Sequence, residues 1–170
     1  MLPIILDGSN LSIGVAAVGE GLVRRLGMLA AAGITDPVVY SDALPQPEQI
    51  ARLHILFIAG LDDKQSRDLA GSAHLAGVIV NVEDAPTLCD FHVPAQVRRG
   101  DLLLTVSTGG RAPGLSHALR EDLQRRFGPE WAGHLDEIAD LRAQWRAQGL
   151  SANMVSERTQ ALLSERGWAA

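Results

Sequence analysis

A carboxylate pair, a thiol and an imidazole closely follow the β-branched apolar run over residues 78–80. Glu83 and Asp84 come directly after the run, and Cys89 and His92 lie a few positions further on. A carboxylate just beyond a buried strand is well placed to act as a general base. Cys89, Asp90 and His92 could ligate a metal, although their spacing matches no compact zinc signature. The pattern alone favours Asp84 and Asp90 as turn caps, so the catalytic interpretation stays open beside that one.

A second candidate is a glycine turn near the N-terminus. Gly19 and Gly21 follow a predicted strand and begin a predicted helix, which is the context in which a backbone can approach a pyrophosphate. The full G-x-G-x-x-G pattern is not present, and Glu20 would place a negative charge near the phosphates. A dinucleotide site and a tight turn without a ligand therefore both remain open.

A third candidate is the small polar loop over residues 107–110, at the start of a later predicted helix. Its backbone N–H groups suit a carboxylate or a phosphate. Arg111 and Arg120 add guanidinium donors, which can bind such an anion with two hydrogen bonds. A simple turn between a strand and a helix requires neither feature, so this segment favours an anion-binding function. The loop consists of Ser107, Thr108, Gly109 and Gly110.

The elements that must position these residues alternate between strand and helix. Apolar runs that suit buried parallel strands are separated by segments with helical periodicity, which predicts βαβ units and a doubly wound parallel sheet in an α/β fold. The expected strands cover 12–18, 37–41, 53–60 and 78–82, with the main helices over 19–33 and 62–77. Further on we expect one strand over 101–110 and helices over 112–128, 131–149 and 152–168.

Each of the first four expected strands ends in polar or glycine residues. Because ligands bind beyond the carboxyl ends of parallel strands, we expect these ends to converge on one crevice. The ends are Gly19–Gly21, Ser41–Asp42, Asp62–Asp63 and Glu83–Asp84.

Composition narrows the possible functions. The 170 residues carry a formal net charge of −5, which argues against a nucleic-acid-binding protein. No apolar stretch approaches the length of a membrane span, and we expect no secretory leader. The single cysteine, Cys89, excludes an internal disulfide and suits the reducing cytoplasm, where we expect the protein to act.

Taken together, these stretches resemble the bifunctional siroheme synthase family, which combines precorrin-2 dehydrogenase and sirohydrochlorin ferrochelatase. The match covers most of residues 2–127. It rests on LPIILD at the start, on GEGLVRRLGMLAAAG after the first strand, and on the specific stretch VIVNVEDAPTLCDFHVPAQVRRGDLLLTVSTGGRAPGLSHALRE over 78–121. The resemblance implies a Rossmann-like NAD domain (1–95), a dimerisation and active-site region (96–128) and a helical C-terminal region (129–170), assembled as a swapped homodimer.

The resemblance also implies a reaction. Family members oxidise precorrin-2 to sirohydrochlorin with NAD and then insert Fe(II) to give siroheme. The family's catalytic aspartate falls in an N-V-x-D-x-P motif, which here places it at Asp84. One carboxylate can take the proton in the oxidation and the pyrrole N–H protons during metal insertion. Iron enters as a substrate, and no resident metal is implied.

Further site residues follow from the same resemblance. The implied NAD contacts are Gly19, Glu20, Gly21, Ser41, Asp42 and Asp62. The substrate is an anionic tetrapyrrole, for which the implied contacts are Arg98, Arg99, Ser107, Thr108, Gly109, Gly110, Arg111 and Arg120.

Three departures from the family pattern lie in the NAD half of the chain. Val18 stands in the glycine-rich run, Leu61 replaces a threonine, and the segment between the second and third strands is short. Two alternatives to the bifunctional enzyme follow. One is a chelatase without useful NAD affinity, and the other is a non-catalytic tetrapyrrole-binding dimer.

Overall fold

The computed structural model describes residues 1–168, and the chain divides into two compact units. The first unit covers Met1–Val93 and the second begins at Pro94. Within the described residues, no helix combines the length and the apolar character that crossing a bilayer requires. Each unit is described by itself below.

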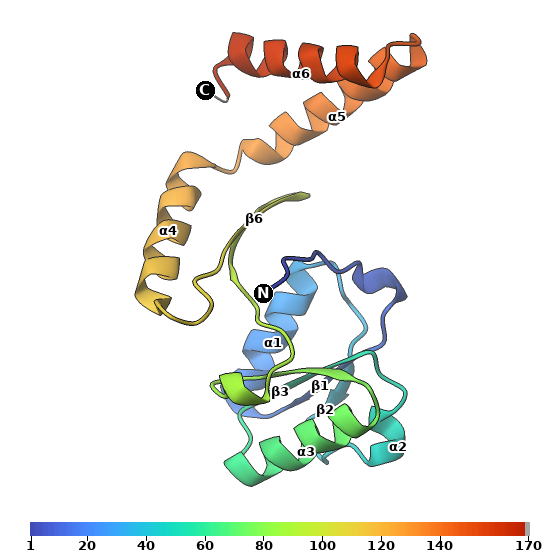
Figure 1. Ribbon diagram of the computed structural model, residues 1–170, viewed down its shortest axis with the longest axis vertical. Helices are drawn as coiled ribbons and strands as arrows, with labels where there is room; N and C mark the ends of the chain where they lie inside the picture. The colour runs from blue at the N-terminus through green and yellow to red at the C-terminus, as the bar shows by residue number, and fades with distance from the viewer. Residues whose placement is uncertain (169–170) are drawn as a thin grey trace. The chain divides into compact units, whose positions relative to one another are not determined.

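The first unit is a parallel sheet covered by helices on both faces (Figure 1). Its strands pair in the order β2-β1-β3-β4, and every pair is parallel. This confirms the predicted doubly wound α/β fold. The elements are β1 (Ile13–Ala17), α1 (Gly19–Ala31), β2 (Val38–Tyr40), α2 (Pro47–Ile50), β3 (Ile55–Ala59), α3 (Asp63–Leu75) and β4 (Ile79–Val82), with 3₁₀ turns at Gly8–Asn10 and Pro86–Leu88.

Alternating side chains of the central strands build two separate cores. In β3, Ile55, Phe57 and Ala59 pack with the apolar side chains of α1. Leu56 and Ile58 point to the other face and pack against α2 and α3. All five are buried, and full burial of one such large aliphatic side chain stabilises a fold by about 1.5–3 kcal/mol. Burial on both faces explains why β3 is apolar throughout.

The two long helices of this unit begin differently. Asp62 caps α3: its carboxylate accepts a hydrogen bond from the Gln65 backbone N–H at 2.8 Å, and the Gln65 side chain accepts one from the Asp62 backbone N–H at 3.3 Å. Helix α1 has Val18 at its N-cap, and this residue has no side-chain oxygen to offer. The first N–H groups of α1 are therefore free of a side-chain cap.

The second unit joins a β-hairpin to three helices. Its elements are β5 (Ala95–Arg99), β6 (Leu102–Val106), α4 (Pro113–Arg126), α5 (Trp131–Ala147) and α6 (Ala152–Arg166). The three helices and β6 were predicted, but β5 was not. Strands β5 and β6 pair antiparallel across the two-residue turn Gly100–Asp101, a dipeptide that is typical of hairpins. That signal was in the sequence, but two adjacent arginines in β5 hide the strand pattern.

The core of the second unit is thin. Of its apolar side chains up to Trp168, only Val97 and Val155 are buried. Helix α6 runs back along α5 (Figure 1), and Arg166 of α6 forms an ion pair with Glu137 of α5 at 2.8 Å. Most apolar side chains of the helices in the second unit therefore stay partly exposed.

Candidate functional site

The carboxyl ends of the four parallel strands lie at one edge of the sheet, as their alternation with helices predicted. The connections from β1 and from β3 lead to opposite sides of the sheet, because β1 is followed by β2 and β3 by β4 in the order β2-β1-β3-β4. The switch point therefore lies between β1 and β3, and ligands of doubly wound folds bind just outside it.

The turn after β1 allows a close approach of helix and strand. Gly19 has a left-handed backbone (φ 57°), which this turn from β1 into α1 requires. At Gly21, a Cβ atom would lie 3.0 Å from the Ala59 Cβ, so glycine is needed for α1 to pack this closely on β3. Val18 is 39% exposed beside this turn, and Leu61 packs against the core on the α3 side of the sheet. These two of the three departures from the family pattern thus differ, because only Val18 presents its side chain near the free helix end.

The end of β2 carries two of the predicted cofactor contacts. Ser41 and Asp42 are exposed, and the Ser41 hydroxyl donates to the Asp42 carboxylate at 3.4 Å. An acidic residue after this strand is where dinucleotide-binding folds hold a ribose hydroxyl. Asp62, another acid of the predicted set, already uses one oxygen to cap α3.

Asp84 follows β4 and has an exposed side chain. Its φ is 58°, and among residues 1–168 it is the one residue other than glycine with a left-handed backbone. Such a conformation costs about 1–2 kcal/mol for most residues, and strained positions gather at functional sites. No pattern in the sequence predicted this strain, although aspartate tolerates it better than most residues.

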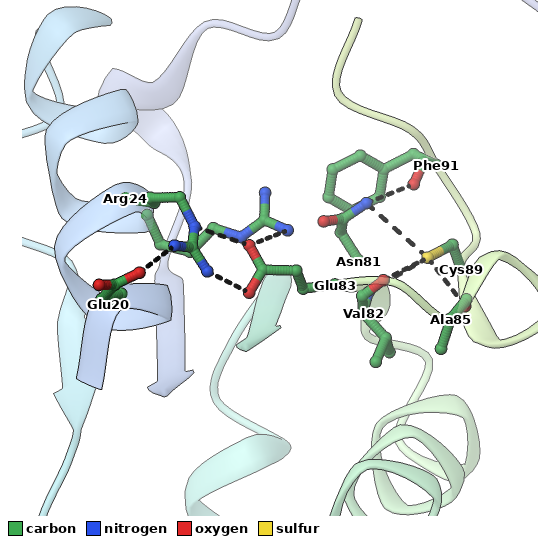
Figure 2. Close-up of polar contacts among 9 residues, drawn as sticks. Glu20, Arg24, Asn81, Val82, Glu83, Ala85, Cys89 and Phe91 are labelled. Carbon is green, nitrogen blue, oxygen red and sulfur yellow. Dashed lines mark hydrogen bonds and ion pairs between the residues drawn. The ribbon is translucent and has the colours of Figure 1, made fainter. Parts of the chain in front are cut away.

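Cys89 holds the loop that contains Asp84. Figure 2 shows its sulfur beside the end of β4, where it accepts a hydrogen bond from the Val82 N–H at 3.1 Å and lies 3.2 Å from the Val82 carbonyl oxygen. The Asp90 carboxylate accepts the Val80 N–H at 2.8 Å and contacts His74 Nε2 at 3.1 Å. Cys89 and Asp90 therefore serve as loop anchors. Within residues 1–168, no three His, Cys, Asp or Glu side chains gather as a metal site.

Glu83 connects this loop to α1 through two arginines that sequence reasoning missed. Arg24 donates to both Glu83 carboxylate oxygens, at 3.3 and 3.2 Å, and also contacts Glu20 at 3.2 Å (Figure 2). Arg25 approaches the same carboxylate at 3.9 Å. Glu83 raises the pKa of Arg24, whereas burial lowers the pKa of Arg25. The negative charge beside Asp84 is therefore compensated.

A cavity of about 340 Å³ opens beside Asp84, within the first unit. Arg25, Asn81, Glu83, Pro86 and His92 also line it. Its volume is at the lower end of the range for small-molecule sites.

The predicted substrate contacts all lie in the second unit. After β6, the loop is shaped by Thr108, whose hydroxyl bonds the Ser116 hydroxyl at 3.0 Å and accepts the Ala112 N–H at 3.3 Å. The Ser107 hydroxyl accepts the Gly109 N–H at 3.3 Å. Gly109 and Gly110 both have positive φ. Pro113 occupies the first turn of α4.

The predicted arginine contacts have different surroundings. Arg99 donates to the backbone carbonyls of Phe127 at 2.8 Å and of Arg98 at 2.9 Å, and so ties β5 to the end of α4. Arg120 contacts the His117 ring at 3.2 Å, and Arg111 is exposed. The guanidinium of Arg99 is thus largely used within the fold.

Comparisons with known proteins agree with this architecture. A family model described as "Putative NAD(P)-binding" matches residues 15–95. The siroheme synthase of Methylococcus capsulatus is 35% identical over 164 residues, which cover 85% of this chain and 34% of that protein. The siroheme synthase of Tolumonas auensis is 29% identical over 163 residues, covering 86% and 34%. The chain therefore spans about a third of the length of these curated relatives.

A solved structure extends the likeness to the fold. The chain matches SirC, a precorrin-2 dehydrogenase, with a TM-score of 0.74 and 18% identity, over 96% of this chain and 89% of that one. At this identity, the match establishes a shared fold.

Proposed function

The chain belongs to the siroheme synthase N-terminal family, and from this premise we propose that it oxidises precorrin-2 to sirohydrochlorin with NAD and inserts Fe(II) into the product. The observation that carries the proposal is the placement of Asp84. Its carboxylate is held by a strained, well-anchored turn on the wall of a cavity, at the sheet edge where the free end of α1 also lies. The cytoplasm, suggested by the lone Cys89, is the proposed location.

Asp84 is the proposed base in both steps. In the oxidation, the carboxylate takes a carbon-bound proton from the substrate; NAD supplies the hydride acceptor when bound. In metal insertion, two pyrrole N–H protons must leave as the cation enters. The exposed carboxylate attracts the cation and accepts a proton, which it can pass to water because it is open to solvent.

The residues of the first unit fit a dinucleotide. The uncapped N-terminus of α1 offers backbone N–H groups to a pyrophosphate, and Gly21 brings the helix close to β3. We assign Asp42 to a ribose hydroxyl, because an acidic residue after this strand commonly has that role in dinucleotide-binding folds. The exposed Val18 side chain narrows the space through which the pyrophosphate would approach the N-terminus of α1. This supports weak rather than tight binding of NAD.

In the second unit, we assign Arg98, Arg111 and Arg120 to the carboxylates of the tetrapyrrole, together with the loop Ser107–Gly110. Arginine binds carboxylates with two parallel hydrogen bonds, and loop N–H groups add further donors. Arg99 shares this proposed role only in part, because the end of α4 already occupies its donors.

One titration series distinguishes the candidate functions. We expect the purified chain to bind NAD and to convert precorrin-2 to sirohydrochlorin, followed by absorbance. Fe(II) added to sirohydrochlorin should then change the absorbance as siroheme forms. Iron insertion without NAD binding would replace the proposal with the chelatase alone. Pigment binding without either reaction would replace it with a non-catalytic dimer.

We also propose that the chain works as a homodimer, because the second unit buries so little apolar surface alone. Leu115 and Leu119 of α4 lie one turn apart and are 52% and 42% exposed. We expect light scattering to give twice the chain mass, and the double variant Leu115→Glu/Leu119→Glu to give the single mass. Gln124→Glu, roughly on the opposite side of α4, is the control that should stay dimeric. A monomeric wild-type chain would contradict the proposal.

A further inference from the structure

Metal insertion releases more protons than the Asp84 carboxylate can hold. Two pyrrole N–H protons must leave the macrocycle when a divalent cation enters it, whereas one carboxylate binds a single proton at a time. Asp84 alone would therefore have to release the first proton to water before it takes the second. A further proton acceptor in the same cavity would allow both protons to leave one bound substrate together.

Most ionisable groups that line this cavity are already engaged within the fold. The Glu83 carboxylate accepts hydrogen bonds from Arg24 at 3.3 and 3.2 Å, and the Cys89 sulfur lies 3.1 Å from the N–H and 3.2 Å from the carbonyl oxygen of Val82 (Figure 2). Arg25 also lines the cavity, but a guanidinium does not give up its proton in proteins and so cannot act as a base. These three residues are therefore unsuited to take a proton from a substrate.

His92 is the remaining ionisable residue that lines the cavity besides Asp84. Its side chain is exposed, so a ligand in the cavity can reach it. Among residues 1–168, hydrogen bonds engage a ring nitrogen of His54, His74 and His117, but no nitrogen of the His92 ring. Histidine is the side chain that most readily exchanges a proton near neutral pH. His92 therefore offers the cavity an accessible base.

The charges of the cavity suit this role. Before the transfer, a neutral imidazole adds no positive charge that would repel the incoming Fe(II), and the Asp84 carboxylate attracts the cation. After the transfer, the His92 ring is positive and shares the cavity with Glu83, whose carboxylate favours a cation, and with the guanidinium of Arg25, which opposes it. Because His92 is exposed, water also solvates its charged form.

We propose that His92 is a catalytic residue that accepts the second pyrrole proton during insertion of Fe(II), while Asp84 accepts the first. This inference rests on the proposed function. Two N–H bonds break, their nitrogens bond to the iron, and the protons go to the Asp84 carboxylate and to one ring nitrogen of His92. The iron stays Fe(II), so the step needs no oxidant or reductant. Precorrin-2 oxidation yields one proton and one hydride, so Asp84 suffices for it.

Insertion of Fe(II) into sirohydrochlorin tests the inference, measured in a single turnover with the full chain in excess. We expect His92→Gln, which stays polar but cannot take the proton, to lower the insertion rate constant by about 10²-fold or more and to keep wild-type precorrin-2 oxidation. His92→Ala should show the same split. Added imidazole should then restore part of its insertion rate, because it supplies the missing base.

His74→Gln is the matched control. The His74 side chain is 44% exposed and contacts Asp90, and neither residue lines the cavity. This variant should keep both rates and should not respond to imidazole.

Three results would count against the inference. A wild-type insertion rate constant in His92→Gln would overturn it, because water would then suffice as the second acceptor. A loss that precorrin-2 oxidation shares, or one that imidazole does not restore in His92→Ala, would overturn it as well, since His92 would then shape the cavity rather than take a proton. A wild-type chain that inserts no iron would instead overturn the proposed chelatase function on which the inference depends.

Discussion

If Asp84 is the base of the proposed precorrin-2 oxidation, replacing it with asparagine is expected to lower kcat by about 10²–10⁴-fold, the range in which a positioned general base contributes. Asparagine has nearly the same shape and tolerates the left-handed backbone that position 84 requires, so the fold should persist. It cannot accept a proton at neutral pH. Steady-state kinetics with NAD, followed by sirohydrochlorin absorbance, measures the effect, and iron insertion should fall as well.

Two further variants make this result specific. Asp63→Asn removes another exposed acid, at the start of α3, whose contact is an ion pair with Arg67, and it should keep wild-type activity. Asp84→Gly relieves the backbone strain while removing the carboxylate, so it should be inactive but at least as stable as Asp84→Asn. An Asp84→Asn protein with wild-type kcat would reject this residue as the base.

Gly60→Ala is expected to cause the largest loss of stability, about 3 kcal/mol or more, through backbone strain and steric overlap together. Gly60 directly follows β3 and has a φ of 69°, and an added Cβ would collide with the backbone carbonyl of Val18. The Val18 carbonyl accepts the Leu22 N–H in the first turn of α1, and the Val18 N–H donates to the Ala59 carbonyl, so a shift of Val18 would strain both hydrogen bonds. For a unit of this size, we expect Tm to fall by roughly 10 °C or more in thermal unfolding followed by circular dichroism.

Gly77→Ala separates the two causes of that loss. Gly77 has a similar φ of 72°, but no atom lies within 4 Å of the position of an added Cβ. Its alanine variant should therefore lose only about 1 kcal/mol, from strain alone. Equal losses at positions 60 and 77 would show that the contact with Val18 is unimportant.

The sheet was predictable because its signals are local. Each central strand is buried on both faces, so β1 and β3 appear in the sequence as uninterrupted apolar runs. Parallel strands then place their carboxyl ends at one edge of the sheet, which brings Asp84 and the glycine turn to that same edge. Asp62 was predictable as a cap from its position before a helical segment.

Other features depend on contacts between residues distant in the chain. The hydrogen bonds between Arg24 and Glu83 join positions 59 apart, and they form only once α1 has packed beside the end of β4. Arg99 was predicted to contact substrate, but it donates a hydrogen bond to the backbone carbonyl of Phe127, 28 positions away. The last carbonyl groups of a helix have no partner within the helix, so they accept hydrogen bonds from other donors.

The parallel sheet, the order of its elements along the chain and the carboxylate at its edge could thus be inferred from the residues alone, since they follow from short-range periodicity and burial. The surroundings of that carboxylate could not: the left-handed turn at Asp84, the pairing of Glu83 with two arginines, and the unpartnered atoms of Arg25 and Asn81 emerge from the folded chain. Hydrogen bonding and desolvation depend on which atoms meet across the fold, and spacing along one segment does not specify that.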